Sequence, residues 1–108
     1  MVYIYIMLFL IKWTVPSEHR VTCWNSFGNM TSEDDIVDAG ENIQVVGRWH
    51  SLGGSGGICI ANASDLASLN SWMLNWSPIC NITVEPIVDD ADARAAIQTK
   101  PYFQAKSE

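Results

Sequence analysis

The sequence predicts one small α+β domain whose elements follow the order β-α-β-β-α-β. Apolar runs rich in strand-forming residues recur at residues 7–15, 43–50, 58–63 and 79–88. Helical spacing of apolar residues occurs between the first and second runs and again between the third and fourth. The chain has 108 residues, 48% of them hydrophobic, which suits one compact core.

The first expected strand, residues 7–15, ends at Pro16 because proline cannot donate to a strand ladder. We expect Ser17 to cap a short amphipathic helix over residues 19–30. Its apolar residues at helical spacing are Val21, Trp24 and Phe27.

The segment 31–42 is rich in acidic residues and predicts a solvated loop. A calcium loop is the alternative. It is a weak one, because the segment lacks the D-x-[DN]-x-[DN]-G order and a correctly spaced closing Glu.

Strands at 43–50 and 58–63 flank the glycine-rich connection 51–57, SLGGSGG, and predict a β-hairpin. A phosphate-binding loop is the competing interpretation. It requires a helix directly after the glycines and, for the Walker pattern, a Gly-Lys-Ser/Thr, and the sequence predicts neither.

Ser64 and Asp65 mark the start of the second helix, and Pro78 marks its end. A stripe of Met and aromatic residues of this kind is typical of a protein core rather than of a cofactor site. The stripe consists of Leu66, Leu69, Met73 and Trp76, with Trp72 beside it.

The last strand, 79–88, contains Pro86, which indicates a bulge or a sheet edge. Asp89, Asp90 and Asp92 favour the start of a short alanine-rich helix that ends at Lys100-Pro101. This order is the ferredoxin-like arrangement, a four-stranded antiparallel sheet with helices on one face, over residues 7–98. Residues 99–108 form a C-terminal tail.

Residues 1–6 have two interpretations. They extend the first strand, or they are a start-site artefact and Met7 is the natural start. The apolar stretch Met1 to Ile11 lacks the basic start and cleavage site of a signal peptide and is too short to span a bilayer.

Strand alternation assigns side chains to the two faces of the sheet. We expect a nearly all-apolar face, including Trp13 and Trp49, to lie under the helices. The polar side chains should gather on the open face as candidate ligand-binding residues: Lys12, Thr14, Gln44, Arg48, His50, Thr83 and Glu85.

The open face also carries Leu8, Leu10, Val46 and Ile87. A face with this much apolar surface seldom stays exposed. Packing of two such faces predicts a homodimer, a dimeric α/β barrel with a partly polar interior.

The net charge of −6 and the scattered Lys and Arg residues argue against nucleic-acid and membrane partners. The odd set Cys23, Cys59 and Cys80 predicts no disulfide framework, no zinc motif and no other metal site. Cys59 and Cys80 lie in apolar runs, where we expect small buried hydrophobic residues. Reduced thiols predict a cytoplasmic location. No cofactor is indicated.

An enzyme hypothesis rests on three residues of the open face. His50 is a candidate general base, Arg48 a candidate anion holder, and Glu85 a candidate for orienting the imidazole across the sheet. In the simpler alternative, Arg48 and Glu85 pair while His50 caps the hairpin.

Tryptophans present a similar choice. Trp13 and Trp49 line a pocket for a flat apolar ligand, or they belong with Trp72 and Trp76 to the core, which is the simpler interpretation.

We therefore expect a homodimeric, non-catalytic binding or interaction domain whose partner is a small apolar ligand or a protein. The alternative is a cofactor-free oxygenase- or isomerase-like enzyme that acts on a small apolar molecule. A cavity of several hundred Å³ lined by Arg48 and His50 favours ligand binding or catalysis. A sheet face filled by a partner's side chains favours interaction.

Several pieces in order resemble one family: MLFLIKWTVP, VVGRWH, the glycine hairpin, SWMLNW and VEPIVDD, over Met7 to Ile97. The family is the domain of unknown function number 3303. The resemblance implies a ferredoxin-like dimeric α/β barrel and a small cytosolic bacterial or phage-borne protein. It implies no activity, cofactor or catalytic residue, and fold alone does not supply them.

Overall fold

A computed structural model describes residues 7–107, so both interpretations of residues 1–6 fall outside the described part of the chain. The elements run in this order: β1 (Met7–Thr14), the 3-10 turn η1 (Ser17–His19), α1 (Arg20–Gly28), α2 (Ser32–Ala39), β2 (Ile43–His50), β3 (Gly56–Ala63), α3 (Leu66–Trp76), β4 (Asn81–Ile87) and α4 (Asp90–Gln98).

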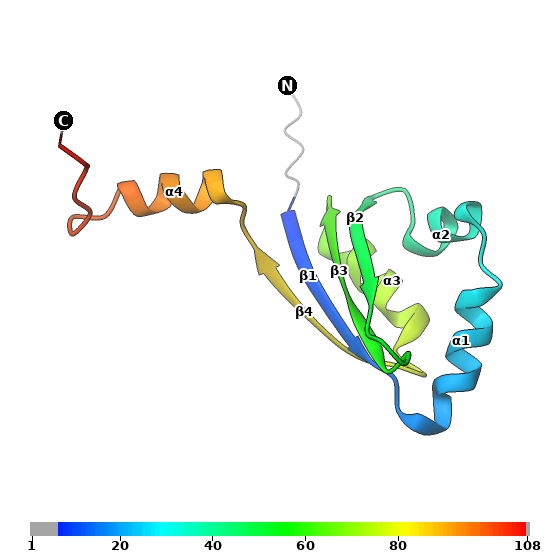
Figure 1. Cartoon of the computed structure of the whole chain (residues 1–108). Coiled ribbons are helices and arrows are strands. Elements are labelled where there is room, and N and C mark those ends of the chain that lie inside the picture. Colours follow the sequence, from blue (N-terminus) through cyan, green and yellow to red (C-terminus); the bar gives the residue numbers. More distant parts are fainter. Residues whose placement is uncertain (1–6, 108) are drawn as a thin grey trace.

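The four strands form one sheet in the order β2-β3-β1-β4, and each neighbouring pair is antiparallel. Helices α1, α2 and α3 lie on one side of this sheet (Figure 1). The predicted α+β class and ferredoxin-like order are therefore confirmed. β4 is an edge strand, which explains why Pro86 is tolerated there.

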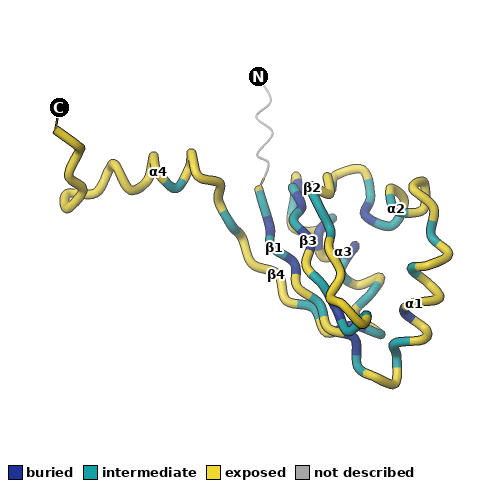
Figure 2. The backbone as a smooth tube through the Cα atoms, in the orientation of Figure 1, coloured by how far each residue is buried: buried dark blue, intermediate teal, exposed yellow. Residues whose placement is uncertain are grey.

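The main core lies between the sheet and α3. Phe9 and Ile11 of β1 and Ala61 of β3 pack against Leu69 and Trp72 of α3. Figure 2 shows buried residues where these strands meet the helical layer, while β4 and α4 are largely exposed. The alternation of the buried residues along β1 confirms that the Phe9 and Ile11 side lies under the helices.

We expected the acidic segment 31–42 to be a loop, but it contains α2. Thr31 accepts a hydrogen bond from the Asp34 backbone amide, and the Asp34 carboxylate accepts one from the Thr31 amide, which makes a capping box. Three acidic residues in the first turn add a favourable interaction with the helix dipole. The negative charge that suggested a solvated loop thus stabilises a helix start.

The first helix is shorter than expected and begins differently. Ser17 lies inside η1 and forms no side-chain cap, so the expectation that it caps the helix is wrong. Cys23 is the buried residue of α1, whereas Val21 is 64% exposed. Helix α1 therefore buries a much narrower stripe than its sequence spacing indicates.

A β-bulge at Val46 reverses the second half of β2. Val45 is opposite Ala61 but Gly47 is opposite Ile60, so Val46 is the additional residue in the ladder. From there on, Arg48 is opposite Cys59, whose partner in β1 is the buried Ile11. The bulge turns every later side chain of β2 to the other face of the sheet.

Two expectations are corrected by this bulge. Arg48 and His50 lie on the helix-covered face and not on the open face. Trp49, which we expected in the core, is 56% exposed on the open face. Its ring lies over Gly47, where a β-carbon would collide with it. The glycine is therefore needed for this packing.

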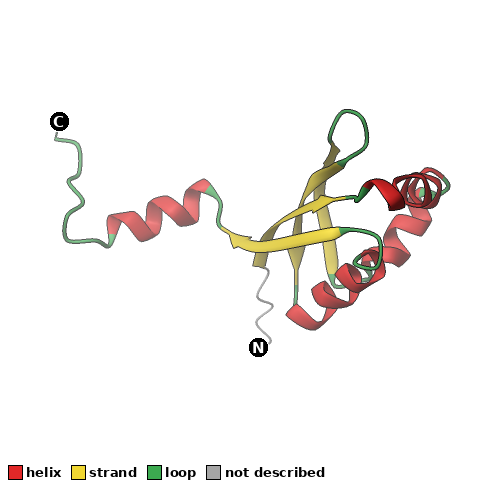
Figure 3. Ribbon diagram, turned by 90° about the horizontal axis from the view of Figure 1, so that it is seen from below, coloured by secondary structure: helices red, strands yellow, loops and turns green. Residues whose placement is uncertain are grey.

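The chain beyond β4 leaves the body of the molecule. Figure 3 shows α4 extending alone past the sheet, away from α1, α2 and α3. Within residues 7–107, no helix has both the length and the apolar character required to cross a bilayer.

Candidate ligand-binding cavity

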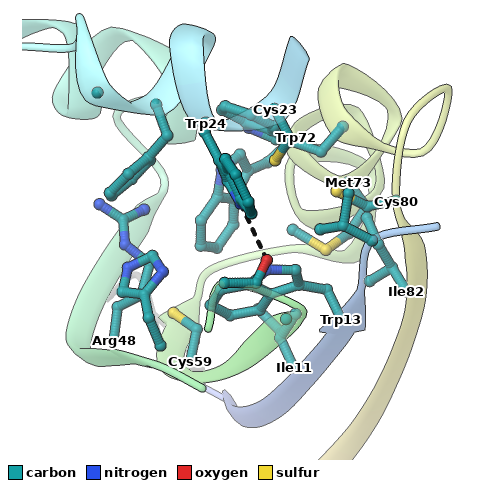
Figure 4. A pocket seen from close by; sticks show the side chains of 17 residues that line it. Ile11, Trp13, Cys23, Trp24, Arg48, Cys59, Trp72, Met73, Cys80 and Ile82 are labelled. Atoms are coloured by element: carbon teal, nitrogen blue, oxygen red, sulfur yellow. Dashed lines mark hydrogen bonds between the residues drawn. The ribbon is translucent and has the colours of Figure 1, made fainter. Parts of the chain in front are cut away.

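A cavity of about 240 Å³ lies between the helix-covered face of the sheet and helices α1 and α3. Its wall is mostly aromatic and aliphatic, and the charged or titratable exceptions are Arg48, His50 and the cysteines (Figure 4). The lining residues include Trp13, Trp24, Phe27, Arg48, His50 and Cys59.

The cavity exists because α1 stands away from the sheet. Trp24 of α1 donates from its indole Nε1 to the Gly54 carbonyl of the β2–β3 connection, across 3.0 Å. Gly54 has φ +78°, and a β-carbon there would lie 2.6 Å from the same indole nitrogen. Glycine is thus required at this contact, which holds α1 over the hairpin and closes one end of the cavity.

The wall on the α3 side is held by one carboxylate. Asp38 of α2 accepts hydrogen bonds from Trp72 Nε1 at 3.0 Å and from Trp76 Nε1 at 2.8 Å. Asn75 also donates to Asp38, so the carboxylate links α2 to three residues of α3. These bonds hold both indole rings in place as rigid walls of the cavity.

The polar end of the cavity is built around Arg48. Its guanidinium forms an ion pair with Asp35 of α2, Nη2 to Oδ1 at 2.9 Å, and lies 4.8 Å from the centre of the Phe27 ring. The Arg48 side chain is 22% exposed. A guanidinium carries five N–H donors, so Arg48 retains donors for a ligand while Asp35 orients it.

His50 lies beside Arg48 between two aromatic rings. It makes an edge contact with Trp13, with ring centres 5.5 Å apart, and a tilted contact with Phe27 at 4.8 Å. Burial lowers the pKa of His50 below its ordinary value, and the nearby Arg48 charge lowers it further. The imidazole is therefore mainly neutral at pH 7, and one ring nitrogen is available as an acceptor.

The three cysteines line the cavity, and all are buried and free of disulfide bonds. Burial raises the pKa of Cys59, although Arg48 opposes the shift. Burial and the neighbouring Cys23 raise the pKa of Cys80 to about 12. The expectation that Cys59 and Cys80 act as small buried hydrophobic residues is confirmed, and neither has the thiolate character of a nucleophile.

The structure separates the predicted site residues into two groups. Arg48 and His50 meet in the cavity. The others are exposed on the open face of the sheet: Lys12, Thr14, Gln44, Thr83 and Glu85.

Glu85 is opposite Leu10 in β4, at the other edge of the sheet from β2. The expected pairing of Glu85 with Arg48, and its contact with His50, are therefore wrong, because Asp35 takes the place next to Arg48. Trp13 lines the cavity as one interpretation predicted, but Trp49 does not.

Sequence reasoning missed Asp35 and gave Trp24 and Phe27 no role beyond the apolar face of the first helix. Two signals indicated the true arrangement. Gly47 inside a strand is typical of a bulge, and Thr31 three residues before Asp34 is typical of a helix start. No group of three His, Cys, Asp or Glu side chains within residues 7–107 is arranged to hold a metal ion.

Comparison with known proteins gives a family but no activity. No curated protein matches the sequence. A solved structure, the crystal structure of MupZ from Pseudomonas fluorescens, is similar over 99% of this chain and 90% of that one. The TM-score is 0.38 and the identity 13%, a level of likeness that carries no functional argument. The model of the family described as domain of unknown function (DUF3303) matches residues 7–101, and this chain therefore belongs to the DUF3303 family.

Proposed function

We propose that this protein binds a small, ring-containing, mostly apolar molecule in the cavity between its sheet and helices α1 and α3. One observation carries the proposal: the bulge at Val46 directs Arg48 and His50 into a cavity whose other walls are mostly aromatic and aliphatic. Ligand pockets typically combine an apolar lining with a few polar groups that set orientation.

The polar end of the cavity limits the chemistry of the ligand. Arg48 offers N–H donors beside Asp35, and neutral His50 offers a further donor or acceptor. A carboxylate or phenolic oxygen attached to an aromatic ring satisfies both residues, while the ring lies against Trp13, Trp24 and Phe27. A volume of about 240 Å³ is below the ~300–1,000 Å³ of pockets for drug-sized ligands, so we expect one or two rings.

Binding is testable with the full chain and naphthalene-1-carboxylate as the probe. Intrinsic tryptophan fluorescence should report it, because Trp13, Trp24, Trp72 and Trp76 line the cavity. We expect saturable quenching, and native mass spectrometry of the protein from its source should show a retained small molecule. Quenching that stays linear up to millimolar probe would reject the proposal.

Gly28 provides a cavity-filling variant with a matched control. Gly28 is one of the lining residues of the cavity, and a β-carbon there meets no atom within 4 Å, so a larger side chain fits at this position without striking the backbone. Gly28→Leu should weaken probe binding at least tenfold. Gly28→Ala should bind as the unmodified chain does, and it should be more stable by ~0.5–1 kcal/mol because alanine favours the helix.

Self-association through the open face of the sheet is the second part of the proposal. The apolar residues there include Leu8, Leu10, Ile58 and Ile60, with the exposed Trp49 at one side. Such a surface favours burial against a second copy. Light scattering after size exclusion should give a dimer at micromolar concentration, and Leu10→Glu should give a monomer. A monomeric unmodified chain would contradict self-association while leaving the cavity proposal intact.

A cofactor-free enzyme acting in the same cavity is a second candidate, favoured by the neutral His50 beside Arg48. An imidazole in this state can remove a proton while the guanidinium stabilises the resulting enolate oxygen. Phenylacetone in D2O tests this by proton NMR. We expect faster exchange of its α-protons with the unmodified chain and none above buffer with His50→Gln. Exchange at the buffer rate in both samples rejects the enzyme candidate.

The proposed location is the cytoplasm. The three buried cysteines are unpaired, as is usual where thiols are kept reduced.

A further inference from the structure

The C-terminal arm, defined here as residues 88–107, makes its own hydrogen bonds but stands clear of the body (Figures 1 and 3). Asp89 caps α4, and the turns at Thr99, Lys100 and Phe103 close on residues of the same segment. The radius of gyration is 17.6 Å, against about 13 Å for a compact chain of this length. The arm, which extends away from the body, contributes to this excess.

The arm has little to stabilise it by itself. Helix α4 has nine residues, and isolated helices shorter than about 12–15 residues are marginal in water. Ile97 is 51% exposed, and Val88, Tyr102 and Phe103 are exposed as well. The arm therefore has apolar surface to bury and helix structure that burial would stabilise.

The part of the arm that follows Asp92 differs in charge from the body. Residues 93–107 contain Arg94, Lys100 and Lys106 and no acidic residue, while every Asp and Glu except Glu108 precedes residue 93. On α4, Arg94 and Ile97 are neighbours at i and i+3, and Lys100 lies just beyond the end of the helix at Gln98. Arg94 also forms an exposed ion pair with Asp90 at 3.8 Å, which leaves its other N–H groups in solvent. The arm thus presents an apolar residue flanked by two cations.

Helix α2 presents the complementary surface. Ile36 and Val37 are 69% and 81% exposed, although both are large aliphatic side chains. Glu33 lies three and four residues before them on the same helix, and Glu41 follows in the turn after Gly40, where α2 has ended. This stripe is an apolar pair flanked by two acidic residues, and nothing within residues 7–107 covers it.

These two surfaces cannot meet within one chain, because α2 and α4 lie at opposite ends of a molecule 57 Å long (Figure 1). The geometry points to an exchange between two copies: the arm of one copy packs along α2 of the other, with Ile97 on Ile36 and Val37 and with Arg94 and Lys100 near Glu33 and Glu41. This inference rests on the proposed self-association and adds a second, reciprocal contact to it.

The same exchange has a consequence for the cavity. Asp35 and Asp38, which hold Arg48 and the indoles of α3, belong to the helix that the partner's arm covers. An arm docked on α2 would therefore stabilise the walls of the cavity in the other copy.

Cross-linking between two different variants tests the contact directly. A full-length Val37→Cys chain and a full-length Ile97→Cys chain are mixed and oxidised with diamide. We expect a disulfide-linked pair in the mixture, at least fivefold above either chain alone. The control replaces Val37→Cys with Leu52→Cys, because Leu52 is 101% exposed on the hairpin connection, away from the stripe.

The outcomes separate this inference from the proposed dimer. A dimer by light scattering that gives no more cross-link than the Leu52→Cys control rejects the arm contact but keeps the open-face dimer. A monomer without cross-link rejects both.

Charge reversal gives an independent readout. Arg94→Glu and Glu33→Arg should each lower the yield of cross-link, and the two together should restore it. A pair of reversals that lowers the yield additively would overturn the assigned pairing.

Discussion

Arg48 of β2 and Asp35 of α2 form an ion pair at 2.9 Å that joins the sheet to a helix. Regular strand alternation would have placed Arg48 on the opposite face of the sheet, away from this helix. The pair depends on Val46 standing outside the ladder, because uninterrupted alternation that counts Val46 as a ladder residue would put Arg48 on the open face. One backbone irregularity therefore supplies the polar end of the cavity.

The strength of this ion pair is accessible by a double-mutant cycle. Arg48→Gln and Asp35→Asn should each destabilise the fold, and the coupling energy should be about 0.5–1 kcal/mol, since both side chains remain partly in solvent. Urea unfolding of the four chains measures it. Strictly additive effects would show that the pair contributes nothing to stability.

The bulge at Val46 implies that deleting this residue and deleting a residue of a regular strand have different effects. Removing Val46 leaves Val45 and Arg48 on the covered face, because Val46 is the residue without a ladder partner. We expect the shortened chain to fold and to keep the cavity. Deletion of Ile60 from β3 is the matched control and should abolish the cooperative transition, since it reverses the alternation of a central strand. Thermal unfolding followed by circular dichroism compares the two, and equal losses would contradict this account of β2.

Asp38 is predicted to be the most important polar residue for stability. Asp38→Ala leaves the indole N–H groups of Trp72 and Trp76 without their acceptor, and such a loss costs ~2–3 kcal/mol. Asp38→Asn keeps one acceptor oxygen and should lose less. Urea unfolding measures both, and tryptophan fluorescence should shift to the red in the alanine variant. A cost below about 0.5 kcal/mol would mean that the indoles find other partners.

His50 should make stability depend on pH. Its pKa is lowered in the folded chain, by burial first and by Arg48 second, so the unfolded chain takes up this proton at a higher pH. Stability should therefore fall as the pH drops below about 6.5, the ordinary value for histidine, and level off once the folded state is also protonated.

The His50→Gln variant is the control for that dependence. Both chains contain His19, so the difference between their melting temperatures from pH 7.5 to pH 5 isolates His50. We expect the melting temperature of the unmodified chain to fall more than that of His50→Gln as the pH is lowered. Parallel curves would show that His50 titrates at the same pH in both states.

Much of the fold was predictable because it depends on local patterns. The alternation of Phe9 and Ile11 identified the covered face of β1, Asp65 marked the start of α3, and the glycine-rich connection marked the hairpin. Each signal lies within a few residues of the structure it specifies. Helix α2 was missed because its acidic residues were interpreted through charge and not through the Thr31–Asp34 cap.

The candidate site was predictable only in part. Arg48 and His50 were named from their chemistry, and they do lie together. The predicted neighbour of Arg48 and His50 was wrong. Whether they lie near Glu85 or near Asp35 depends on the face of the sheet to which Arg48 and His50 point, and a shift of one residue in β2 decides that face. Trp24 belongs to the site through its bond to Gly54, a contact between residues 30 positions apart.

The sequence by itself determined the order of the strands and of α1, α3 and α4, since local propensity and periodicity encode it, and residue type identified the side chains able to do chemistry. The family followed from the resemblance of several segments in order. The tertiary structure alone decided where that chemistry points. The bulge leaves Val46 without a ladder partner and turns the side chains of Arg48, Trp49 and His50 to the face opposite to the one expected. Arg48 and His50 therefore face the cavity, and Trp49 faces outward. Register is a property of the paired strands, and it appears only when β2 lies against β3.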